Sequence, residues 1–124
     1  MRPLILTAVL LLASCAAPPP PPGAELARVT AGRIAGPPQE CVTTFGQQNL
    51  RVVDSATLAY GDGRTVYINH LPGPCPGMEQ LNTLIIDAHG GQYCRGDRVR
   101  GVEPGANIPG PSCNLGSWVP YSMH

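Results

Sequence analysis

Four cysteines, Cys41, Cys75, Cys94 and Cys113, are spread through the later part of this 124-residue chain. The same region is poor in large aromatic side chains, because the whole sequence holds one Phe and one Trp beside four Tyr. A core built on Val, Ile and Leu in so small a domain is marginal in stability without covalent help. An even set of cysteines in an exported chain supplies such help as disulfides. The cysteines therefore predict a small disulfide-bonded domain.

Four cysteines allow three pairings, and their spacing alone does not choose among them. We favour Cys75 with Cys94, which closes a loop worth about 3 kcal/mol in the chain-entropy model, and Cys41 with Cys113, worth about 4 kcal/mol. A close alternative pairs Cys41 with Cys75, and Cys94 with Cys113.

Metal binding is a rival reading of the same cysteines. His70 precedes Cys75 by the spacing that separates His89 from Cys94. Zinc sites, however, usually contain a close Cys-x2–4-Cys pair, and thiolates outside the cytosol tend to be oxidised. We therefore predict disulfides, no metal site and no cofactor.

The amino-terminal residues have the pattern of an export signal. Arg2 precedes the apolar run Leu4–Ala13, which suits a signal peptide and is shorter than the roughly 20 residues of a membrane-spanning helix. Leu12–Cys15 then resembles the bacterial lipobox. That resemblance implies cleavage before Cys15 and its modification with diacylglycerol and an acyl chain such as palmitate. An ordinary cleaved signal with a chance cysteine is the alternative.

Lipidation of Cys15 also removes the odd cysteine among the five. The absence of Asp after Cys15 implies, by resemblance to Gram-negative lipoproteins, the outer membrane facing the periplasm. Pro18–Pro22 predicts an extended polyproline spacer, with a docking site for a Pro-binding partner as the alternative. The expected organisation is a signal peptide (1–14), a lipidated, disordered Pro-rich tether (15–38) and one small domain (39–124).

Short strands separated by Gly, Pro and Asp dominate the domain sequence. The firmest prediction is a hairpin of residues 57–60 and 65–71, in which the Asp-Gly pair at 62–63 supplies positive φ angles for the turn. Residues 78–82 allow at most one helical turn. Together these segments predict an all-β fold, a small sandwich or barrel-like sheet. The other expected strands are residues 50–53, 83–87, 98–102 and 116–119.

No charge excess or catalytic motif points to an activity. Eight basic residues balance eight acidic ones, and the basic residues are scattered, which argues against nucleic acid. Asp54 and Asp97 are interpreted as turn residues whose carboxylates accept backbone N–H groups. Trp118 and Tyr121 are expected to pack on the core and not to form a binding patch. The remaining candidate side chains for acid–base chemistry are Glu79, Asp87, Glu103, His70 and His89.

The order and spacing of several elements resemble a family of short, uncharacterised Gram-negative lipoproteins, a domain of unknown function. The resemblance rests on Cys41, Cys75-Pro-Gly77, Cys94–Val99 and Cys113–Gly116, together with Val52–Asp54, Tyr67, Leu71 and Pro120. It implies a compact disulfide-bonded β domain and carries no catalytic residue across.

The expected function is that of a membrane-anchored, non-enzymatic binding or structural module with an envelope protein as partner. A specific version is an inhibitor of a cell-wall lytic enzyme or a protease, for which residues 71–77 or 105–111 would provide a stiff exposed loop. A small periplasmic enzyme and a metal-handling protein using His70 and His89 remain as alternatives.

Overall fold

The structure is a computed structural model that describes residues 3–4, 10, 18–45 and 49–123. Cys15 and most of the predicted signal peptide lie outside the described residues. The elements follow in the order α1 (Ala24–Val29), β1 (Ile34–Ala35), β2 (Cys41–Thr43), β3 (Arg51–Asp54), β4 (Thr57–Tyr60), β5 (Thr65–His70), β6 (Thr83–Ile86), β7 (Gln92–Cys94), β8 (Arg98–Val102), β9 (Cys113–Asn114) and β10 (Trp118–Ser122). The predicted all-β class is confirmed.

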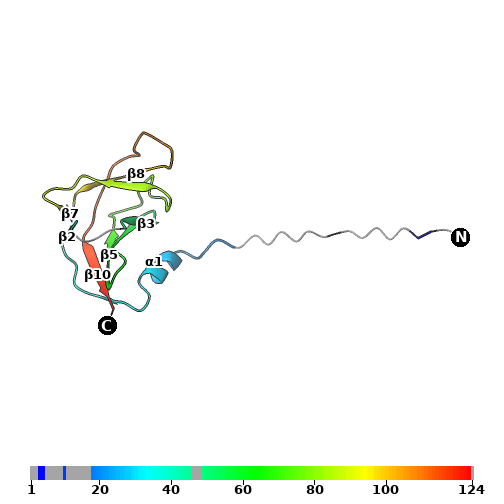
Figure 1. The fold of residues 1–124 in the computed structure, drawn as a ribbon, viewed down its shortest axis with the longest axis horizontal. Helices are drawn as coiled ribbons and strands as arrows, with labels where there is room; N and C mark the ends of the chain where they lie inside the picture. Colours follow the sequence, from blue (N-terminus) through cyan, green and yellow to red (C-terminus); the bar gives the residue numbers. More distant parts are fainter. Residues whose placement is uncertain (1–2, 5–9, 11–17, 46–48, 124) are drawn as a thin grey trace.

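The strands form three antiparallel sheets. The largest has the order β1-β10-β5-β4-β3, a second pairs β2 with β7, and a third has the order β6-β8-β9. Figure 1 shows β8 across the top of the domain, with the strands of the largest sheet below it. Most of the connections are turns rich in Gly and Pro, which explains why strands of two to six residues alternate so rapidly.

One face of the five-stranded sheet carries the main core. Leu58 on β4 and Trp118 on β10 lie on this face, flanking Asn69 of β5, and all three side chains are 0% exposed. The Trp118 indole N–H donates to the Tyr93 carbonyl at 3.0 Å, so its polar end is satisfied. Trp118 thus packs in the core as predicted. The same cluster also contains Val42, Val52, Tyr60, Leu71, Cys75, Met78, Val99 and Leu115.

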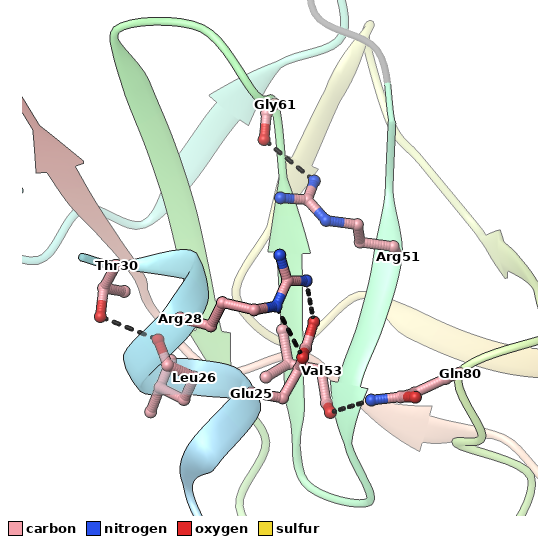
Figure 2. A network of polar contacts seen from close by, with 8 residues as sticks. All are labelled: Glu25, Leu26, Arg28, Thr30, Arg51, Val53, Gly61 and Gln80. Atoms are coloured by element: carbon pink, nitrogen blue, oxygen red, sulfur yellow. Dashed lines mark hydrogen bonds and ion pairs between the residues drawn. The ribbon is translucent and has the colours of Figure 1, made fainter.

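The opposite face of that sheet is covered by α1. Leu26 and Val29 of this short helix pack against a second cluster made of Val53, Ala59, Val66 and Ile68, with Tyr121 beside them. Figure 2 shows the helix lying against the sheet, with the Arg28 guanidinium paired to the Glu25 carboxylate. On the β3 side of the same view, Arg51 donates to the Gly61 carbonyl at 3.0 Å and Gln80 to the Val53 carbonyl at 3.3 Å.

The packing of α1 brings residues before position 39 into the folded domain. Helix α1 rests on the sheet, and β1 pairs with β10 through Ile34 and Ser122 and through Ala35 and Tyr121. Both elements lie in the segment that the sequence assigned to the tether. In the described chain, the extended proline run Pro18–Pro22 is exposed and leads directly into α1.

The predicted hairpin is confirmed, but its turn is built differently. Strands β4 and β5 pair in the register Thr57 to His70 and Tyr60 to Tyr67. The positive φ angle falls on Gly61, at 82°, and not on the Asp62-Gly63 pair. With Tyr60 opposite Tyr67, the connection is longer than a two-residue loop, so the Asp-Gly dipeptide does not need the conformation of a tight turn.

The favoured disulfide pairing is wrong, and so is the alternative weighed beside it. The disulfides join Cys41 to Cys94 and Cys75 to Cys113. Cys41 and Cys94 are direct cross-strand partners in the β2–β7 ladder, and neither strand was predicted. Because loop-closure entropy depends weakly on loop length, the pairing of β2 with β7 and not loop length brings Cys41 and Cys94 together.

Candidate functional site

Two surface features lie at the two ends of β8. At its start is a hollow that we call the polar pocket, lined by Asp87, His89, Gly96, Asp97 and Arg98, with a volume of about 480 Å³. At its end the chain leaves β8 into a convex segment, residues 103–111, that we call the 103–111 loop.

A tight hairpin positions His89 at the rim of the polar pocket. His89 and Gln92 form an isolated antiparallel bridge, and the two residues between them are Gly90 and Gly91 with φ angles of 66° and 72°. Two successive positive φ angles define a type I′ turn, which glycine adopts without steric cost. The Gly-Gly pair therefore places His89 on a short, well-defined connection, with its side chain 83% exposed.

A second turn holds Asp97 against His89. The Asp97 N–H donates to the Cys94 carbonyl at 3.0 Å, and Gly96 between them has a φ of 88°, as the third position of a type II turn requires. Asp97 Oδ2 accepts the Cys94 N–H at 2.8 Å, which confirms the predicted turn role of this carboxylate. Asp97 Oδ1 lies 3.4 Å from His89 Nδ1. One carboxylate oxygen thus accepts a backbone N–H, and the other faces the imidazole.

The outer face of β8 supplies Arg98 to the polar pocket, with Arg100 next to it on the same face. Arg98 and Arg100 share this face because side chains alternate along a strand, and Val99 between them is fully buried. Arg100 lies 3.9 Å from the Asp87 carboxylate. The Arg98 side chain is exposed, and among the described residues no hydrogen bond or ion pair engages it.

The 103–111 loop is fixed at several points along its length. Its first four residues form a turn closed by the Ala106 N–H and the Glu103 carbonyl at 3.0 Å, with Pro104 and Gly105 at the positions that a type II turn favours and a φ of 79° at Gly105. The Gly110 N–H donates to the Gly101 carbonyl at 2.9 Å and closes the base.

Ile108 stands at the exposed part of this loop. Its side chain is 83% exposed, and Pro109 restricts the backbone directly after it. Behind the loop is a smaller hollow of about 210 Å³ lined by Ile108, Pro111, Ala106, Asn82 and neighbouring residues. Cys113, two residues beyond Pro111, is tied to the buried Cys75. The loop therefore presents an apolar side chain from a pinned backbone.

The other loop proposed from the sequence, residues 71–77, is packed differently. The Leu71 N–H donates to Ala56 and the Cys75 N–H to Ser55, both at 2.8 Å. Leu71 and Cys75 are buried. This segment turns Leu71 and Cys75 inward and exposes only its prolines among its apolar side chains, so it lacks an exposed aliphatic anchor comparable with Ile108.

The other candidate residues from the sequence lie in a turn, beside the core, in the polar pocket or in disulfides. Asp54 Oδ1 accepts the Ala56 N–H at 2.9 Å, as predicted for a turn carboxylate. Tyr121 packs beside the second core cluster. Of the candidate carboxylates, the structure brings Asp87 and Asp97 to one pocket, together with His89. Cys75 and Cys94, which the His-x4-Cys spacing suggested as ligands, are both in disulfides.

Sequence reasoning missed Arg98 and the position of the polar pocket. The available signal was a pair of glycine turns, His89–Gln92 and Cys94–Asp97, placed just before an Arg-bearing strand. Within residues 3–4, 10, 18–45 and 49–123, no cluster of three or more His, Cys, Asp or Glu residues is arranged to hold a metal ion. Over the same ranges, no helix is long and apolar enough to cross a bilayer.

Comparison with protein families identifies one of unknown function. The model of a family of unknown function, DUF6491, matches residues 1–117. No curated protein and no solved structure matches the chain. The match covers both surface features at the ends of β8 and assigns a role to neither.

Proposed function

Because this chain belongs to the family of unknown function DUF6491, we propose a role from its own geometry: it is a lipid-anchored, non-enzymatic envelope protein that binds a partner protein through the 103–111 loop. The observation that carries the proposal is Ile108, an apolar side chain 83% exposed on a loop closed by the bond from the Gly110 N–H to Gly101.

A pinned loop with one protruding apolar residue suits insertion into a partner's cleft. Binding costs free energy for every side chain and loop that must be ordered, and a loop fixed beforehand avoids much of that cost. Interfaces are commonly dominated by a few anchor side chains that fill fully desolvated pockets. The turn at Glu103–Ala106 and the disulfide at Cys113 fix this loop on both sides of Ile108.

The anchoring part of the proposal rests on Cys15 and the proline run. Acyl chains on Cys15 would hold the amino end at the membrane, since each buried methylene contributes about 0.8 kcal/mol. The proline run Pro18–Pro22 would add about 15 Å to the reach of this anchor at about 3.1 Å per residue. In Figure 1 the chain enters the domain beside α1, well separated from the loop that follows β8, which leaves the loop free for a second protein.

A more specific version of the proposal is inhibition of a cell-wall lytic enzyme or a protease. A stiff convex loop with an exposed aliphatic residue is the shape that blocks an enzyme cleft by occupying it. Under this version, Ile108 fills the cleft of the partner enzyme and lowers its activity in proportion to binding.

Site-specific crosslinking tests the loop proposal with a matched control in the same chain. Leu81 is 85% exposed and lies outside the loop, so a photo-crosslinking residue at 81 is compared with one at 108 in the lipidated protein. We expect one envelope protein to crosslink from 108 and not from 81, and Ile108→Asp to abolish its copurification while Leu81→Asp leaves it intact. Equal capture from both positions would contradict the loop assignment.

The anchor is tested separately. Mass spectrometry of the mature protein is expected to show acylation at Cys15, and Cys15→Ser is expected to release the protein from the membrane fraction. A mature amino terminus without lipid would remove the anchoring proposal while leaving the loop proposal standing.

A further inference from the structure

The polar pocket carries an inference that is independent of the loop, because it lies at the opposite end of β8. We infer that this pocket binds a small monoanionic ligand through a carboxylate, such as the free carboxyl end of a peptide, with Arg98 as the principal contact. The charged groups of the pocket differ in whether they already have partners within the chain.

The two anionic groups of the pocket are held to different degrees. Asp97 is directed inward, with Oδ2 on the Cys94 N–H and Oδ1 3.4 Å from His89 Nδ1, and its side chain is 12% exposed. Asp87 is 53% exposed and lies 3.9 Å from Arg100. Asp97 is therefore held by the chain itself, whereas Asp87 keeps a negative charge at the edge of the pocket.

Arg98 is the charge without a partner. Arg98 lines the pocket, and no hydrogen bond or ion pair in the described part of the chain occupies its guanidinium. A guanidinium offers paired N–H donors that match the two oxygens of a carboxylate. His89 lies at the rim, where its Nδ1 faces Asp97 and its Nε2 has no hydrogen bond among the described residues.

The floor of the pocket leaves room for such a ligand. Gly96 has a φ of 88°, and a Cβ at this position would meet nothing within 4 Å. Space therefore opens directly above the turn that holds Asp97. The hollow of about 480 Å³ exceeds the size of a carboxylate and accommodates the group that carries it.

The two aspartates select the charge of the ligand. Asp87 and Asp97 both line the pocket with Arg98, so a dianion such as phosphate meets stronger repulsion there than a monoanion does. A carboxylate has the two-oxygen geometry that suits Arg98, and its single charge meets about half of the repulsion from the aspartates that a dianion meets. The pocket chemistry thus favours carboxylate over phosphate.

Titration of the full-length protein in detergent tests the inference. Sodium acetate and N-acetylalanine are the probes, sodium phosphate is the competing anion, and sodium chloride controls for ionic strength. Nuclear magnetic resonance follows the side-chain signals of Arg98 and His89. We expect saturable shifts with the two carboxylates and weaker binding of phosphate.

Three variants separate the roles of the charges. Arg98→Gln is expected to weaken carboxylate binding about tenfold, and Asp87→Asn to strengthen it about threefold by removing a negative charge. The matched control is Arg95→Gln, because Arg95 is 61% exposed, lies 3.7 Å from Glu40 and does not line the pocket. It is expected to leave the affinity unchanged.

Buried Trp118 reports through its fluorescence that each variant is folded. Equal losses in Arg98→Gln and Arg95→Gln would overturn the site assignment. Phosphate binding as tight as that of acetate would overturn the carboxylate preference. Neither result bears on the crosslinking from residue 108, so the two proposals fail separately.

Discussion

Asn69 offers the sharpest test of how this fold is held together. Its side chain is 0% exposed on the core face of the five-stranded sheet. Asn69 Nδ2 donates to the Gly116 carbonyl and Asn69 Oδ1 accepts the Gly116 N–H, both at 2.8 Å. One side chain thus satisfies both backbone groups of a residue 47 positions away. Replacing it by Ala leaves both Gly116 groups without these partners beside the core.

The expected loss follows from the two unpaired groups. A buried backbone donor or acceptor left without a partner costs about 1–3 kcal/mol. Because Gly116 is half-buried and water can replace part of each bond, Asn69→Ala is expected to lower the free energy of unfolding by about 1–3 kcal/mol in total. A small domain has a total of about 5–15 kcal/mol. Asn69→Leu restores the volume but not the hydrogen bonds, so it is expected to lose a similar amount.

Urea unfolding followed by fluorescence measures these losses, since Trp118 is the single tryptophan and is fully buried. The matched control is Asn107→Ala, an exposed asparagine of the 103–111 loop, expected to change stability by less than about 0.5 kcal/mol. If the free energy of unfolding of Asn69→Leu lies within about 0.5 kcal/mol of that of the unaltered protein, packing and not hydrogen bonding explains the stabilising effect of Asn69. That result would refute the role given to the two hydrogen bonds.

Three further predictions follow from the same structure. Removing either disulfide is expected to lower the free energy of unfolding by about 4 kcal/mol in the chain-entropy model. In urea unfolding, the double variant Cys75→Ala/Cys113→Ala is expected to be less stable than Cys41→Ala/Cys94→Ala, because Cys75 is buried at 3% exposure. Equal losses of stability in the two double variants would contradict this. Gly101→Ala is expected to destabilise the fold and speed hydrogen exchange in the 103–111 loop, because its Cβ would overlap the Gly77 carbonyl, whereas Gly63→Ala has open space and is the neutral control. The hydrogen bond from Arg28 lowers the pKa of Glu25; since the folded pKa is depressed, the stabilisation of α1 is present above the ordinary value of 4.5 and lost as pH falls through the folded pKa. The protection factors of the α1 amides, which measure the slowing of exchange relative to the unfolded chain at the same pH, should therefore fall on acidification, and Glu25→Gln should flatten that response.

Local patterns in the sequence predicted the strands well. The alternation that placed Val66 and Ile68 on one face of β5 is confirmed, with both side chains at 1% exposure or less. The pattern is readable because side chains alternate across a strand. It gave no hint that Asn69, on the other face, is fully buried, because its partner Gly116 is distant in the sequence.

The shortest strands could not be predicted either, because their pairing partners are also distant in the sequence. β1, β2, β7 and β9 have two or three residues each, too few for a period to show. α1 has six residues and no side-chain cap at Gly23, so it lacks the usual start signal. These elements exist because the tertiary structure supplies their partners, as Tyr121 does for Ala35.

The two surface features were predictable to different degrees. The 103–111 loop follows from its own composition, since Pro104-Gly105 marks a turn wherever it occurs. The polar pocket depends on a juxtaposition: the His89–Gln92 hairpin must lie beside the Cys94–Asp97 turn for His89 to meet Asp97. The disulfide from Cys94 to Cys41 fixes that second turn to β2. A pairing that sequence spacing could not choose therefore also determines where the pocket lies, which is why the pocket and the disulfide were missed together.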